Sequence, residues 1–79
     1  MPTFNGHKNW NHWNVALWIG GDETMYRLAQ AAIRLTKNKD GATRCFLSWL
    51  DAGNVHETPD GAPYTFSTVR AALRGFHKG

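Results

Sequence analysis

The chain has few residues whose types and spacing could form a catalytic or metal site. Its softest ligands are four histidines and one cysteine: His7, His12, His56, His77 and Cys45. His7 and His12 are five residues apart, which does not place both on one face of a helix. Zinc sites carry closely spaced ligand pairs, and neither a Cys-x-x-Cys nor a His-Glu-x-x-His motif is present. We therefore expect no metal site and no cofactor.

The sequence also offers few candidate residues for nucleophilic or acid–base catalysis. Cys45 shares an apolar helix face with Phe46 and Trp49, so we expect a buried, inert thiol and not a thiolate activated by a basic partner. No glycine-rich phosphate loop is present, because Gly20-Gly21 precedes Asp22, whose charge would repel a phosphate. The carboxylates fall mostly at predicted helix ends and turns: Asp22, Glu23, Asp40, Asp51, Glu57 and Asp60. We predict that the protein is not an enzyme and has no catalytic residue.

Basic residues near the C-terminus are the best candidates for binding a partner. The segment 65–78 places hydroxyl groups before several cations, as in helices that contact phosphates and base edges of DNA. The alternative is that these arginines are simply solvated. A second basic patch is expected on the outer face of an earlier helix. The residues predicted to bind a partner or nucleic acid are Ser67, Thr68, Arg70, Arg74 and Lys78, with Arg27 and Arg34 as the second patch.

Length and composition fit one small domain over residues 1–79, with residues 1–8 as a flexible arm. The single cysteine allows no intrachain disulfide and fits a reducing compartment. No signal peptide and no run of 18 apolar residues is found, so we expect a cytoplasmic protein of the host cell that does not contact a membrane. The formal charge of +3 permits contact with nucleic acid or an acidic surface and requires neither.

Hydrophobic periodicity and turn residues predict an all-α fold, a compact bundle of four short helices. Before the last helix, Thr58-Pro59-Asp60-Gly61 predicts a turn, around which a very short hairpin can form. Asn9 and Asp22 are expected to cap the first two helices. The expected helices cover residues 9–19, 22–37, 40–52 and 66–74.

The first expected helix carries three of the four tryptophans and is predicted to be the centre of the core. Trp10, Trp13 and Leu17 share one face, and Val15 and Ile19 lie on the opposite side. An aromatic platform for stacking bases is the alternative for the tryptophans. The second helix is expected to bury the stripe Met25, Leu28, Ala29, Ala32 and Leu35. Asn14 lies within the aromatic arc, so its amide needs hydrogen-bond partners if that arc is buried.

Two segments resemble known families. HKNWNHWNVALWI together with TPDGAPYTFSTVRAAL resembles a family of small proteins encoded by phages and prophages, which implies a compact domain with no established activity. Residues 42–74 are similar to part of the DNA-binding domain of large serine recombinases, which implies a C-terminal half like a helix–turn–helix and not recombination, since no catalytic serine domain is present. The matching positions are Thr58, Pro59, Gly61, Tyr64, Thr68, Val69, Arg70 and Leu73.

Small size, missing catalytic groups and the phage resemblance together lead to three functional hypotheses. The first is a phage protein that binds and inhibits a host protein complex, such as an anti-CRISPR acting on a nucleic-acid-processing defence complex. The alternative is a small regulator that binds double-stranded DNA through the helix over residues 66–74. The second alternative is a minor structural protein of the virion. The sequence is compatible with a monomer or a homodimer.

Overall fold

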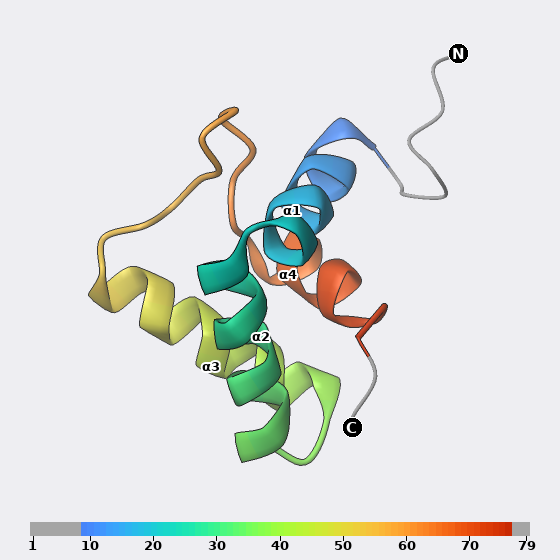
Figure 1. Ribbon diagram of the computed structural model, residues 1–79, viewed down its shortest axis with the longest axis vertical. Coiled ribbons are helices and arrows are strands. Elements are labelled where there is room, and N and C mark those ends of the chain that lie inside the picture. Colours follow the sequence, from blue (N-terminus) through green and yellow to red (C-terminus); the bar gives the residue numbers. More distant parts are fainter. Residues whose placement is uncertain (1–8, 77–79) are drawn as a thin grey trace.

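Four helices arranged around one core make up the part of the chain that the computed structural model describes, residues 9–76 (Figure 1). The predicted all-α bundle is confirmed. The helices are α1 (Trp10–Gly21), α2 (Glu23–Leu35), α3 (Lys39–Ala52) and α4 (Phe66–Leu73). Within residues 9–76 the predicted hairpin is reduced to one isolated antiparallel bridge between Glu57 and Pro63. No helix in this part of the chain combines the length and apolar character needed to span a membrane.

The helices begin where local side-chain chemistry predicts. The side chains of Asn9 and Asp22 accept hydrogen bonds from backbone N–H groups three residues later, at 3.0 and 3.1 Å. Thr65 and Thr68 form a capping box at the start of α4. The helix ends were predicted less well. α1 continues through Gly21 instead of stopping at residue 19, and α2 ends at Leu35, two residues early.

α4 contacts helices from both the first and the second half of the chain. It packs against both α1 and α3, and α2 lies between α1 and α3 in sequence and contacts both (Figure 1). Much of the buried surface comes from alanines and medium-sized aliphatic side chains, so the helices approach one another closely. The core residues that are no more than 5 % exposed are Val15, Ile19, Ala29, Ala32, Ile33, Ala42, Phe46, Leu50, Ala62, Val69 and Leu73.

The predicted inner face of α1 was wrong. Val15 and Ile19 are fully buried, whereas Trp10 and Leu17 are 39 % and 49 % exposed. The physical reason is size, because a core with five alanines leaves room for valine and isoleucine at the α1–α4 contact and not for a row of indoles. Leu35 was also misplaced. It is 72 % exposed at the end of α2, where Ile33 takes the buried position.

A buried polar network fixes the long connection between α3 and α4, residues 53–65, onto α1. Asn14 is 1 % exposed, and its Oδ1 accepts a hydrogen bond of 2.6 Å from Thr58 Oγ1. The Asn14 Nδ2 and the Trp18 Nε1 each donate a hydrogen bond of 2.9 Å to Oδ2 of Asp60. Thr58 also accepts from the backbone N–H of Ala62 at 3.0 Å. The expectation that a buried Asn14 needs partners is therefore met by residues of the Thr58–Gly61 turn.

Candidate functional site

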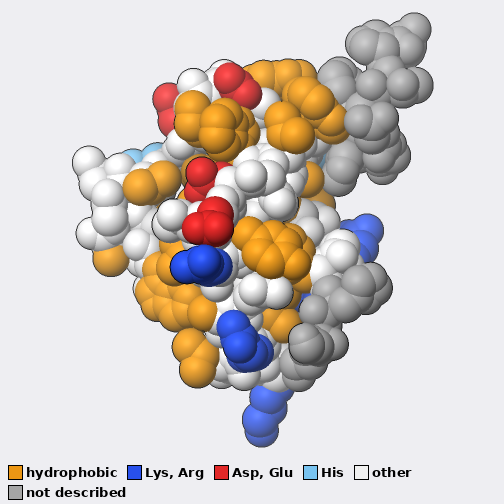
Figure 2. Space-filling model, viewed as in Figure 1, with side chains coloured by type: hydrophobic (Ala, Val, Ile, Leu, Met, Phe, Trp, Pro, Cys, Tyr) orange, Lys and Arg blue, Asp and Glu red, His pale blue; other side chains and the backbone are white. Residues whose placement is uncertain are grey.

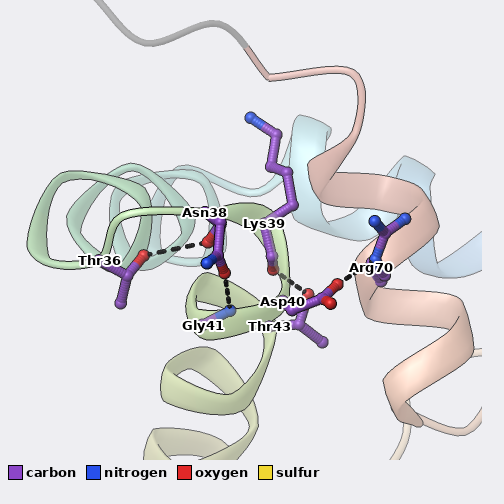
Figure 3. Close-up of polar contacts among 7 residues, drawn as sticks. All are labelled: Thr36, Asn38, Lys39, Asp40, Gly41, Thr43 and Arg70. Carbon is purple, nitrogen blue, oxygen red and sulfur yellow. Dashed lines mark hydrogen bonds and ion pairs between the residues drawn. The ribbon is translucent and has the colours of Figure 1, made fainter.

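The turn between α2 and α3 is held by short hydrogen bonds of its own residues (Figure 3). Thr36 ends α2, and its Oγ1 donates to the carbonyl oxygen of Ala32 at 2.6 Å. Asn38 begins α3, and its Oδ1 accepts from the backbone N–H of Gly41 at 2.7 Å. Backbone groups that would otherwise be unpaired at the two helix ends are thus partly hydrogen-bonded within the turn itself. These bonds restrict the conformation of the turn.

Gly41 allows this close packing. A Cβ at position 41 would lie 3.3 Å from Asn38 Oδ1 and 3.4 Å from the Cβ of Thr36. The first distance is tighter than most contacts and the second is at the lower end of ordinary contact, so the Asn38 side chain must shift by a few tenths of an ångström to admit a Cβ. A glycine at the third position of α3 is a poor helix former, and this close approach explains its presence.

The start of α3 is also tied to the end of α4. Arg70 reaches from α4 to the carboxylate of Asp40, to which it is hydrogen-bonded and ion-paired (Figure 3). This hydrogen bond lowers the pKa of Asp40 below its ordinary value, with a smaller contribution from the charges of Arg70 and Arg44. The Lys39 Nζ donates to the carbonyl oxygen of Phe76 at 3.1 Å. The turn and the segment after α4 therefore form one surface.

Next to the turn lies a shallow hollow of about 330 Å³, lined by Ile33, Lys37, Asn38 and Lys39. Ile33 supplies an apolar wall and the two lysines supply positive charge. Ile33 belongs to α2, whereas Lys37 follows the extended residue Thr36, and the turn brings both to the hollow. The hollow can accept a small apolar group that carries or adjoins a negative charge.

Arg34 and Leu35 are exposed in the last turn of α2, and Arg74 is exposed directly after α4. We call the basic end the set Arg34, Leu35, Lys37, Lys39 and Arg74. Leu35 is the most exposed of the large hydrophobic side chains described, at 72 %. Figure 2 shows Asp and Glu side chains on the upper half of one face and Lys and Arg on the lower half. On this face the acidic side chains therefore lie mostly above the basic ones.

The structure divides the predicted binding residues into two groups. Arg34 and Arg74, which the sequence placed in separate patches, both belong to the basic end and are exposed. Arg70 is engaged by Asp40, and Arg27 pairs with Glu23 at 3.4 Å on the exposed side of α2. Lys78 lies outside the described residues.

The predicted hydroxyl contacts are used inside the fold. Thr68 is 4 % exposed, and its Oγ1 accepts from the Thr65 backbone N–H at 2.9 Å and donates to the Pro63 carbonyl at 3.0 Å. Ser67 Oγ is hydrogen-bonded to His12 Nε2 at 3.0 Å. The start of α4 is thus occupied by contacts with the preceding connection and with α1.

Sequence reasoning missed Ile33, Leu35, Lys37 and Lys39 as parts of a site. The basic residues were interpreted as a helix end, and Leu35 was assigned to the core. The sequence offered no signal that Ile33 and Lys37 lie together, because α2 ends at Leu35 and the extended Thr36 separates the two residues. The cation that completes the rim, Lys39, belongs to the next helix and could not be placed without the turn geometry.

No group of three His, Cys, Asp or Glu side chains within residues 9–76 is close enough to hold a metal ion. Cys45 is half-buried on α3.

The described residues form a small all-α domain with a hollow lined by Ile33 and two lysines at the α2–α3 turn. The chain belongs to the family of unknown function DUF7249, whose model matches residues 1–72. No curated protein matches the chain, and no solved structure matches it. The family covers all four helices up to Ala72 and assigns no activity to them.

Proposed function

We propose that this chain is a non-enzymatic, phage-type protein that binds and inhibits a host protein complex in the cytoplasm. An anti-CRISPR or a similar inhibitor of a nucleic-acid-processing defence complex is the concrete case. The observation that supports it is the basic end, which combines a hollow lined by Ile33 and two lysines with the exposed Leu35 of the last turn of α2. Apolar anchors ringed by charge are typical of protein–protein contacts.

The chemistry of the basic end defines the partner surface that would fit. Lys37, Lys39 and Arg74 favour a negatively charged partner, and they raise the rate of encounter at low salt. Leu35 offers an apolar side chain of the kind that becomes buried at the centre of an interface. The firm Thr36–Gly41 turn favours binding, because little conformational entropy is lost when the surface is already ordered.

A capture experiment with matched variants tests this proposal. The tagged protein is incubated with host lysate, and the bound proteins are identified and quantified. The double variant Leu35→Ser/Lys37→Glu changes only exposed side chains of the basic end. We expect the wild type to recover a stoichiometric protein partner and the double variant to lose it.

The control is Arg27→Ala, which removes an exposed cation of α2 outside the basic end. It should retain the partner. Recovery of nucleic acid alone, or equal recovery by the double variant, would contradict the proposal. Inhibition is tested separately by adding the purified protein to the purified partner complex, and full activity at saturation would remove the inhibitory role.

The DNA-binding alternative draws support from the same cations but not from α4. A recognition helix offers free hydroxyl and cationic side chains to the groove, whereas Thr68 and Arg70 are engaged within the fold. A mobility-shift assay with a duplex at low salt distinguishes the two functions. Binding that falls steeply with salt and is lost in Arg70→Ala/Arg74→Ala favours DNA, and no shift at low salt excludes it.

A further inference from the structure

The outer face of α1 is apolar, uncharged and exposed. Trp10, Trp13 and Leu17 follow one another along this face at helical spacing, with Trp10 and Leu17 39 % and 49 % exposed and Trp13 half-buried. No Asp, Glu, Lys or Arg occurs between Trp10 and Gly21. An exposed row of large apolar side chains of this kind marks an interaction surface.

The two halves of this face have opposite shapes. The first half carries the two bulky indoles, and the second half ends in Gly20 and Gly21. A Cβ added at either glycine would meet no heavy atom of another described part of the fold within 4 Å. The outer face of α1 therefore carries large side chains at its N-terminal end and none at its C-terminal end.

We infer that the outer face of α1 pairs with the same face of a second copy of this chain, in an antiparallel arrangement. A two-fold axis between residues 15 and 16 places Trp10 of each copy over Gly21 of the other. The same axis places Trp13 of one copy beside Leu17 of the other, and it sets the two Leu17 positions about 4.5 Å apart along the helices. The bulky indole of each copy thus faces the glycines of the other, and the two contacts are equivalent, as an isologous interface requires.

Charge supports the antiparallel direction. Asp22, which caps α2, and Glu23, which pairs with the exposed Arg27, immediately follow α1, and the first turn of α1 contains no acidic residue. Antiparallel pairing brings these carboxylates near the partner's helix N-terminus, which carries the positive end of the helix dipole. A parallel arrangement would instead bring the two pairs of carboxylates together.

The size of the face sets the strength of the association. A helix of 12 residues is about 18 Å long, so a helix pair of this length buries less than the roughly 1,600 Å² of a standard interface. We expect a weak dimer with a dissociation constant of about 10–100 µM. The pairing goes beyond the proposed function, because the basic end lies on other elements and is left uncovered.

Analytical ultracentrifugation of the full chain over a concentration series tests the pairing. The average mass should rise from 8.9 kDa towards twice that value as concentration increases. Gly21→Gln should weaken the association about tenfold or more, because the glutamine side chain occupies the space that Trp10 of the second copy would fill. The monomer itself has open space at position 21. Leu17→Lys should also abolish the dimer, since two ammonium groups then meet near the axis.

Leu35→Ser is the matched control, because it changes an exposed leucine of the basic end and should leave the mass profile unchanged. Circular dichroism and urea unfolding at low concentration verify that each variant folds. A chain that stays at 8.9 kDa at every concentration overturns the inference. A dimer that is unaffected by both Gly21→Gln and Leu17→Lys overturns it as well. Loss of partner capture with intact dimerisation, or the reverse, separates this pairing from the proposed function.

Discussion

The turn between α2 and α3 and the connection between α3 and α4 are fixed in opposite ways. The turn spans residues 36–38, and the hydrogen bonds of Thr36 and Asn38 that hold it span at most four residues. The connection spans residues 53–65 and depends on Asn14 and Trp18, more than 40 residues earlier in the chain. A locally held turn can change its exposed side chains without disturbing the core. The long connection, in contrast, contributes directly to global stability.

Substitution of Asn14 should cause the largest loss of stability in either region. In Asn14→Leu the buried hydroxyl of Thr58 loses its acceptor and Asp60 loses a donor. Unfolding in urea should show a loss of about 2–4 kcal/mol, because buried polar groups are left without partners. Asn11→Leu, at a half-buried position of the same helix, should change stability by less than about 0.5 kcal/mol. Equal effects of the two variants would mean that the network does not hold the connection.

A smaller loss is expected at Thr58. Thr58→Val keeps the shape of the side chain but removes the oxygen that links Asn14 to the backbone N–H of Ala62. The free energy of unfolding should fall by about 1–2 kcal/mol. The double variant with Asn14→Leu should lose at least about 0.5 kcal/mol less than the sum of the single losses. Simple additivity would show that the two side chains act independently.

Substitutions in the locally held turn should reduce the free energy of unfolding by less. Asn38→Ala removes the cap of α3, and urea unfolding should show a loss of about 1 kcal/mol. Asn38→Asp retains an acceptor oxygen at the cap and should recover most of that stability. A loss as large as that of Asn14→Leu would remove the distinction between the two connections.

Acid should weaken both regions through one carboxylate each. The hydrogen bonds from Asn14 and Trp18 lower the pKa of Asp60 below its ordinary value of 3.8, as Arg70 does for Asp40. A carboxyl with a lowered pKa stabilises the fold above its ordinary pKa, and this contribution is lost as the pH falls through the lower, folded-state value. Urea midpoints measured below pH 4 should therefore decline with pH, and less steeply in Asp60→Asn. Unchanged slopes would contradict the assignment.

The features predictable from sequence are those set by neighbours in the chain. Asn9 and Asp22 were expected as caps, because each acts within three residues of itself. The all-α class followed from helical periodicity in the same way. These features need no knowledge of what packs against each helix.

The features that could not be predicted depend on distant partners. Trp10 was assigned to the core on hydrophobicity alone, but the side of α1 that becomes buried is decided by α4 and by the 53–65 connection. Arg70 was assigned to a partner because Asp40 is 30 residues away in sequence. The hollow at the α2–α3 turn needs side chains from two helices, and its rim is visible only once Lys39 is placed.

The packing of α1 against α4 has a consequence for the order of events during synthesis. α1 leaves the ribosome first, while the helix on which it packs most extensively is completed 52 residues later, at residue 73. At about 5–20 residues per second, roughly 3–10 s separate the two. During this interval Val15 and Ile19 lack their contact with α4, so the nascent chain presents apolar surface to chaperones until α4 is synthesised.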